Sequence, residues 1–149
     1  MRTHAWLVVA AGLLVAADAR DDAIQKDKAA LRGTWQVTAL EERGEVATAA
    51  EIQRMRMVFS DDKLVIKGLE EGKDLEAAYF LDPTQKPAAI DVIPAEGDEK
   101  GKKVLAIYVI DQDVLKICAA QKSGQERPKG FVTAKEAPYV LISLKRQNR

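Results

Sequence analysis

The sequence is poor in the side chains that most often carry catalysis and metal binding. Its 149 residues include one histidine, His4, and one cysteine, Cys118. Cleavage of residues 1–19, expected for the reasons given below, would also remove His4. A chain without histidine cannot form a Ser-His-Asp or Cys-His catalytic site, and it lacks the imidazole ligands of most transition-metal centres. We therefore expect a non-enzymatic protein with no catalytic residues, no metal site and no cofactor.

An excess of charge of either sign is also missing. Lysine and arginine together number 23, and aspartate and glutamate together number 23. Loss of Arg2 and Asp18 with residues 1–19 would leave 22 of each. Without net charge or a basic cluster, the chain lacks the electrostatic pattern of a nucleic-acid binder and of a polybasic membrane-surface protein. We expect no nucleic-acid partner.

A single cysteine cannot form a disulfide within the chain. In an oxidising compartment, a lone thiol is buried and inert, paired with another chain, or reactive. Cys118 ends the run Val114–Cys118, which is typical of a strand. Because free cysteine is among the most buried residue types, we expect this thiol to be buried and inert.

The first 19 residues have the organisation of a secretory signal peptide. Arg2 provides a basic start, Ala5–Ala17 is an uncharged apolar run, and Ala17 and Ala19 are the small residues that a signal peptidase reads. The run is shorter than the roughly 20 residues that span a bilayer, and no basic cluster follows it. We expect cleavage after Ala19, export to the periplasm or the extracellular space, and no transmembrane segment in the mature protein.

The remaining 130 residues (149 less 19) are enough for one domain. Residues 20–32 predict a short N-terminal helix or tether, and residues 33–149 a β domain. Thr48 and Glu51 form a capping-box pattern, which predicts a short helix over residues 48–54. Alternation of apolar and polar residues predicts eight strands, over residues 34–39, 55–59, 64–66, 75–81, 89–93, 104–110, 114–118 and 139–146.

Short turns join most of these strands, so there is no room for crossover helices between them. Ser60–Lys63 is a typical turn sequence, and Gly or Pro lies between several other strands. The pattern favours an antiparallel barrel or sandwich over a parallel sheet. We expect an all-β fold, an eight-stranded antiparallel barrel, present as a monomer.

Gly33-Thr34-Trp35 begins the first strand after a short helix and resembles the Gly-x-Trp motif of the lipocalin superfamily. In that superfamily an arginine near the end of the last strand packs across the tryptophan ring. Leu144-Lys145-Arg146 ends the last predicted strand, and Arg146 closes an apolar row of alternating residues. A guanidinium over an indole is a favourable contact that would join the first strand to the last and close the barrel.

Taken together, several short motifs resemble those of small secreted lipocalin-like domains known chiefly from planctomycete bacteria, a family with no assigned function. They are Leu31–Trp35, Phe80–Pro83 with Pro87, Ile90-Asp91, Gly101, Ile107-Tyr108, Asp113, Leu115, Cys118, Arg127-Pro128, Phe131 and Leu144–Arg146. Ala106 and Gln112 depart from the pattern, where glycine is expected. The resemblance implies a fold and a secretion route, and it brings no catalytic residues.

Carboxylates are the main catalytic groups left in a chain without histidine. Asp82, Asp91, Glu96 and Asp98 could form a glycosidase-like pair of acids, or they could be ordinary loop residues, which we favour. Asp111 and Asp113 could bind a hard cation, but the other ligands of a calcium loop are missing. We expect a simple turn there.

The longest predicted loop covers residues 120–138 and contains Arg127-Pro128-Lys129-Gly130-Phe131. A loop of this length is often functional, but a fixed Arg-Pro with a phenylalanine could equally seal one end of the barrel. The sequence leaves both interpretations open.

The barrel interior is the remaining candidate site. Eight strands enclose a space that side chains fill or that holds one small ligand. Short strands slightly favour a filled core. If the interior is open, we expect its lining to include Trp35, Met57, Phe59, Tyr79 and Ile107. The leading hypothesis is an exported protein that binds a small apolar or amphipathic ligand. The alternatives are a filled-barrel scaffold that binds other proteins of the cell envelope and, less favoured, a carboxylate-based hydrolase.

Overall fold

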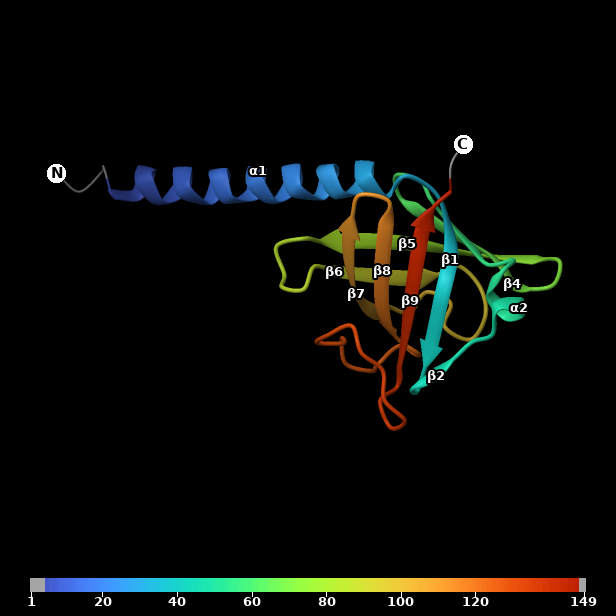
Figure 1. The fold of residues 1–149 in the computed structure, drawn as a ribbon. Helices are drawn as coiled ribbons and strands as arrows, with labels where there is room; N and C mark the ends of the chain where they lie inside the picture. The colour runs from blue at the N-terminus through green and yellow to red at the C-terminus, as the bar shows by residue number, and fades with distance from the viewer. Residues whose placement is uncertain (1–4, 148–149) are drawn as a thin grey trace.

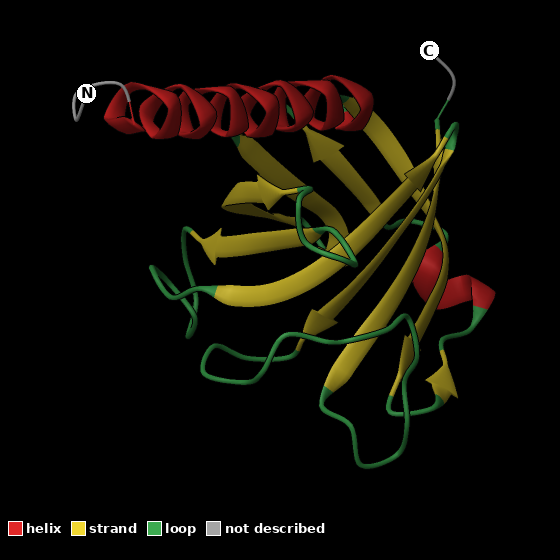
Figure 2. Cartoon of the chain, turned by 90° about the vertical axis from the view of Figure 1, so that its left-hand side faces the viewer, coloured by secondary structure: helices red, strands yellow, loops and turns green. Residues whose placement is uncertain are grey.

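The protein is a closed antiparallel β-barrel with a long helix whose C-terminal part lies over one end and whose N-terminal part projects beyond the barrel (Figures 1 and 2). The computed structural model describes residues 5–147, with side chains from Ala17 onward. The elements are α1 (Ala5–Leu31), β1 (Gly33–Glu42), β2 (Glu45–Val46), α2 (Ala49–Ile52), β3 (Arg56–Phe59), β4 (Lys63–Glu70), β5 (Lys73–Asp82), β6 (Ala89–Pro94), β7 (Val104–Asp111), β8 (Val114–Ala120) and β9 (Tyr139–Arg146).

Eight strands close the barrel, in agreement with the sequence pattern. Each of β3 to β8 pairs with the next strand along the chain, β1 pairs with β3, and β1 also pairs with β9. The β1–β9 register places Trp35 opposite Arg146 and Glu42 opposite Val140, with an irregularity between Val37 and Ala39. The two-residue strand β2 was not expected. It extends the end of β1 through the Arg43-Gly44 turn, in which both residues have positive φ.

The capping box predicted from the sequence is present. Thr48 accepts a hydrogen bond from the backbone N–H of Glu51, and its own N–H donates to the Glu51 carboxylate at 2.6 Å. The helix itself covers only Ala49–Ile52, and Ile52 is its buried residue. It is therefore shorter than the expected 48–54 segment.

The N-terminal helix is longer than residues 20–32. It begins at Ala5 and ends at Leu31, so it continues through most of the predicted signal peptide. Residues 1–4 of that predicted segment lie outside the described residues. Ala17, Asp18 and Ala19 are exposed, and among the described side chains of α1 those that make polar contacts with the barrel come later in the chain. Over the described part of the chain, no helix combines the length and apolar character needed to cross a membrane.

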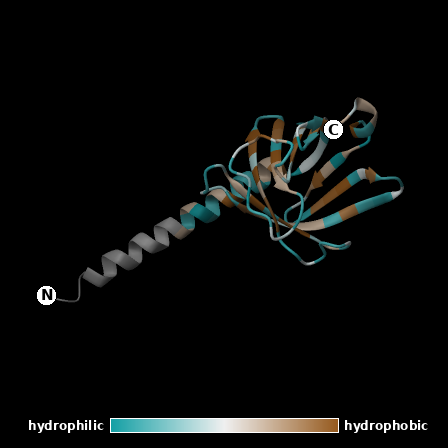
Figure 3. Cartoon of the chain, turned by 90° about the horizontal axis from the view of Figure 1, so that it is seen from below, coloured by the Kyte–Doolittle hydropathy of each residue, from teal (hydrophilic) through white to brown (hydrophobic). Residues whose placement is uncertain are grey.

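The two ends of the barrel differ. The strand ends near Gly33, Phe59, Asp82 and Arg146 face α1 and form what we call the closed end. The opposite end, called the mouth, carries the β4–β5 hairpin and the loop after β6, and β8 ends and β9 begins there. Coloured by hydropathy, the strands carry hydrophobic segments interrupted by hydrophilic ones, and the connecting loops are largely hydrophilic (Figure 3).

Candidate functional site

The closed end of the barrel is filled by large side chains. Trp35, Phe59 and Tyr79 are at most 2% exposed, and the rings of Phe59 and Tyr79 meet edge to face with centroids 5.4 Å apart. Tyr108, Leu115 and Leu144 belong to the same buried cluster. This half of the interior is a packed core. It matches the filled barrel, which was one of the two alternatives that the sequence left open.

Trp35 and Arg146 form the contact that the sequence predicted. The guanidinium carbon of Arg146 lies 4.2 Å from the centroid of the Trp35 ring. Trp35 donates from Nε1 to the carbonyl oxygen of Leu31 at 2.8 Å. Because both residues also reach the last turn of α1, the pair closes the barrel and holds the helix at the same point.

α1 makes further polar contacts with the closed end. The Tyr108 hydroxyl donates to the Asp27 carboxylate at 2.6 Å, and Arg20 lies 3.4 Å from Asp82. Burial raises the pKa of Tyr108, and the hydrogen bond to Asp27 and its negative charge raise it further. The Tyr108 hydroxyl thus reaches from the buried cluster to α1, and these polar contacts hold the helix against the closed end.

The half of the barrel near the mouth is hollow. A cavity of about 480 Å³ opens there, which lies within the usual range for small-molecule sites. Its wall is made mostly of apolar side chains from the strands, and its polar lining residues come from the strand ends and loops at the rim. The apolar wall includes Val37, Leu40, Met55, Met57, Leu64, Ile66, Leu69, Leu75, Ala77, Ile90, Val92, Val104, Ala106, Ile117, Ala119, Val140 and Ile142.

Of the five residues expected to line the interior, Met57 lines this cavity. Trp35, Phe59 and Tyr79 lie in the packed core at the closed end instead. Ile107 faces the outside of the barrel, because it alternates with Ala106, which lines the cavity. The expectation that Ile107 lies in the interior is therefore wrong.

The outer face around Ile107 is covered by the loop of residues 121–138. Ile107 pairs with Cys118, and the Cys118 sulfur lies 3.9 Å from the carbonyl oxygen of Val132. Arg127 ties the same loop to β6 and β7 through the Asp91 carboxylate at 2.7 Å and the Ala106 carbonyl at 2.7 Å. The loop thus packs on the wall of the barrel, and among its described residues only Gln121 lines the cavity.

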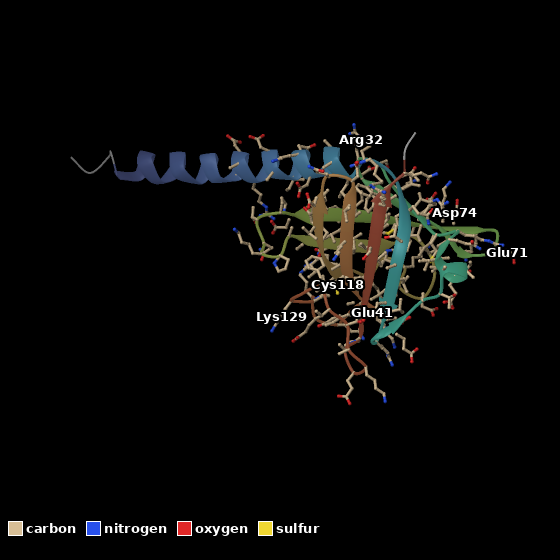
Figure 4. The ribbon with its side chains drawn as sticks, in the orientation of Figure 1. Arg32, Glu41, Glu71, Asp74, Cys118 and Lys129 are labelled. Atoms are coloured by element: carbon tan, nitrogen blue, oxygen red, sulfur yellow. The ribbon has the colours of Figure 1, made fainter. Side chains whose placement is uncertain are left out.

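Cys118 is completely buried, as the sequence analysis expected. Burial raises the pKa of its thiol, which disfavours the reactive thiolate. Figure 4 shows Cys118 on β8, with Lys129 on the neighbouring loop.

The four candidate carboxylates fall in two separate places. Asp82 and Asp91 line a small hollow on the outer surface with Arg20 and Arg127, whereas Glu96 and Asp98 lie at the rim of the cavity. Hydrogen bonds from Thr84 lower the pKa of Asp82. A general acid at neutral pH requires the opposite shift.

Gln112 and Asp113 form a two-residue hairpin turn between β7, which ends at Asp111, and β8, and Asp113 accepts a hydrogen bond from Arg146 Nε at 3.2 Å. Within the described part of the chain, no three His, Cys, Asp or Glu side chains are grouped closely enough to hold a metal ion.

The fold and the cavity define a class: a closed eight-stranded antiparallel barrel, filled at one end and hollow at the other. Comparison of the chain with family models, with curated proteins and with solved structures gives no match. The residues themselves therefore carry the functional argument.

Proposed function

We propose that the protein binds a small apolar or amphipathic molecule in the barrel cavity. The observation that carries this proposal is an apolar cavity of about 480 Å³ that opens at one end of a closed barrel. A cavity of this size lined by hydrocarbon leaves apolar surface for a ligand to cover, at about 25 cal/mol per Å² of area removed from water. The large packed core at the other end makes the scaffold stable without filling the cavity.

A neutral fluorescent probe tests this function. Nile red emission increases in an apolar site, so titration of the protein with Nile red reports occupation of the cavity. Ala119 lines the cavity from β8, and Ala119→Trp would fill part of it. Lys116 is exposed on the same strand, so Lys116→Trp is the matched control.

We expect Ala119→Trp to weaken Nile red binding at least tenfold and Lys116→Trp to leave it unchanged. Circular dichroism and thermal melting identify variants that do not fold. Val92→Phe is a second cavity-filling variant if Ala119→Trp does not fold. Failure of the wild-type protein to bind Nile red, or equal binding by folded cavity-filling variants, would refute the proposal.

We further propose that the protein is exported with cleavage after Ala19 and belongs to the lipocalin-like family named above. Support for cleavage comes from α1: over its described side chains, from Ala17 onward, the polar contacts with the barrel involve Arg20, Asp27, Ala30 and Leu31, all of which the mature chain would keep. Support for the family comes from the Trp35–Arg146 contact. N-terminal sequencing of protein recovered from a secreting host tests the export proposal, with Arg20 as the expected first residue. Recovery of uncleaved chain would count against it.

A further inference from the structure

The cavity wall and the cavity rim have different chemistry. The wall is hydrocarbon, and over the described residues no buried side chain is polar or charged apart from tyrosines that are directed toward the closed end. A polar ligand group placed deep in the cavity would therefore find no side-chain partner. Burying an unpaired polar group costs about 1–3 kcal/mol. The buried part of the ligand must therefore be apolar, and any polar group must lie at the mouth.

The charged residues that line the cavity are all acidic. Four carboxylates line the cavity, Glu42 at the end of β1 and Glu96, Asp98 and Glu99 in the loop after β6, and no lysine or arginine lines it. These side chains lie where a ligand head group would emerge from the apolar wall. Three of these four charges thus lie on one side of a single opening, beside low-dielectric walls that concentrate their field.

Neighbouring groups neutralise part of the negative charge of these carboxylates, and Asp98 keeps its charge without a partner among the described residues. Glu96 lies 3.9 Å from the Lys73 ammonium group, and Glu99 accepts a hydrogen bond from the Ser123 N–H at 3.0 Å. Hydrogen bonding with Ser123 lowers the pKa of Glu99, and the nearby charges of Lys102 and Lys122 lower it further. Asp98 makes no hydrogen bond or ion pair with any described residue in the structure, and it is exposed.

A second, wider hollow adjoins the mouth and shares Leu40, Glu42, Met55, Leu69 and Val140 with the cavity. It adds Glu45, Glu51, Arg43 and Lys135. Glu51 is engaged by the Thr48 capping box, and Arg43 donates to Gln121. Basic groups are therefore present beside this hollow. The loop after β6 also carries Lys100, Lys102 and Lys103, but the charged residues that it contributes to the cavity lining are all acidic.

We propose that the cavity selects amphiphiles with an apolar body and a positively charged head group, of the long-chain amine or quaternary ammonium class. This inference rests on the proposed function and names the ligand class of the same site. The apolar body fills the cavity, and the cationic head lies among Glu96, Asp98 and Glu99. A carboxylate or sulfate head group in the same position would meet like charges.

Three probes that share one hydrocarbon chain separate the effect of the head group from that of the cavity. They are dodecyltrimethylammonium, dodecanol and dodecanoate. The two ions are titrated calorimetrically below the concentrations at which they form micelles, and dodecanol below its solubility limit. At low ionic strength we expect dodecyltrimethylammonium to bind roughly tenfold or more tightly than dodecanoate, with dodecanol between them. The difference should shrink with added salt, because the rim is exposed to solvent.

Charge variants locate the source of the preference. The triple variant Glu96→Gln, Asp98→Asn, Glu99→Gln should lose most of the difference between the cation and the anion and keep its affinity for dodecanol. The control triple variant Asp21→Asn, Asp22→Asn, Asp111→Asn makes the same change in net charge at exposed positions of α1 and the closed end. It should retain the preference of the wild-type protein.

The outcomes separate the two proposals. If dodecanoate binds as tightly as the cation, or if the rim variant keeps the full preference, the head-group inference is overturned while binding in the cavity stands. If none of the three probes binds, the proposed function fails and the head-group inference fails with it.

Discussion

The guanidinium of Arg146 binds Trp35 and α1 at the same time. Its carbon lies 4.2 Å from the centroid of the indole ring, and its nitrogens donate to the carbonyl oxygens of Ala30 at 2.5 Å and Arg32 at 3.1 Å. Carbonyl groups at the end of a helix lack partners within the helix, and a cation there is favourable. One side chain therefore closes the barrel and caps the helix.

Arg146→Ala should lower the free energy of unfolding by about 2–4 kcal/mol, because the contact with the ring and the hydrogen bonds from a charged donor are lost together. Arg146→Lys should lower the free energy of unfolding by an intermediate amount, because an ammonium group keeps the charge but lacks the planar set of N–H donors of a guanidinium. Urea denaturation measures both. Lys145 is exposed on the same strand, so Lys145→Ala is the control. Equal stability of Arg146→Ala and Lys145→Ala would contradict this account.

Tyr108→Phe should loosen α1 without opening the barrel. The variant removes the donor to Asp27, whose hydrogen bond measures 2.6 Å, at a cost of about 1–3 kcal/mol. Amide hydrogen exchange should speed up in residues 20–31 more than in the strands. Unchanged exchange in this part of α1 would show that other contacts hold the helix.

The raised pKa of Tyr108 predicts a loss of stability in alkaline solution. Burial, aided by Asp27, raises the pKa of the folded state above the ordinary value of 10.0. Above about pH 10 the unfolded chain therefore releases a proton that the folded chain keeps, and the free energy of unfolding falls by up to about 1.4 kcal/mol per pH unit. Below that pH the contribution is fully present.

Denaturation midpoints measured between pH 8 and 11 test the alkaline effect. The wild-type protein should lose stability more steeply than Tyr108→Phe above about pH 10. Tyr79, whose pKa is also raised by burial, remains in both proteins and cancels in the comparison. Parallel pH profiles would rule out Tyr108 as the source.

Gln112→Gly should stabilise the protein. Gln112 has a φ of +53° in the β7–β8 turn, a conformation that costs an L-residue about 1–2 kcal/mol and costs glycine little. Glycine also has more conformational entropy in the unfolded chain, which offsets part of this benefit. The net increase in the free energy of unfolding is about 0.5–1 kcal/mol. Thermal melting measures it. Gln112→Ala keeps the β-carbon and should give no comparable gain.

Arg127→Ala should expose the thiol of Cys118. Arg127 joins the loop of residues 121–138 to Asp91 and to the Ala106 carbonyl, and this loop covers Cys118 through Val132. In the wild-type protein, we expect the thiol to react with a disulfide reagent only on unfolding. In Arg127→Ala the native-state rate should rise at least tenfold. Lys129→Ala, an exposed change in the same loop, should leave the rate as it is.

The strands and the closure of the barrel follow from local patterns that the sequence displays. Alternation of apolar and polar residues marks the strands. Trp35 and Arg146 are recognisable because Trp35 lies at the start of the first strand and Arg146 follows an apolar row in the last strand. The capping box of Thr48 and Glu51 is a contact between residues three apart, so it can be read without knowledge of the fold.

The direction in which strand residues point was harder to predict. In β7, Ala106, Ile107 and Tyr108 are all buried, because the barrel interior covers one face and the 121–138 loop covers the other. A strand covered on both faces loses its alternation, and nothing local assigns Ile107 to the outside. The cavity could not be predicted from the sequence either, because its size depends on which side chains meet across the barrel and not on any single segment.

Both ends of the described chain leave the barrel on the side away from the mouth. α1 joins β1 at the closed end, and β9 finishes there at Arg146 (Figure 1). If the protein is immobilised on a surface or fused to another domain through either end, the attachment lies at the closed end. The mouth of the cavity then faces the solution. Binding measurements on tethered protein would leave the entrance unobstructed.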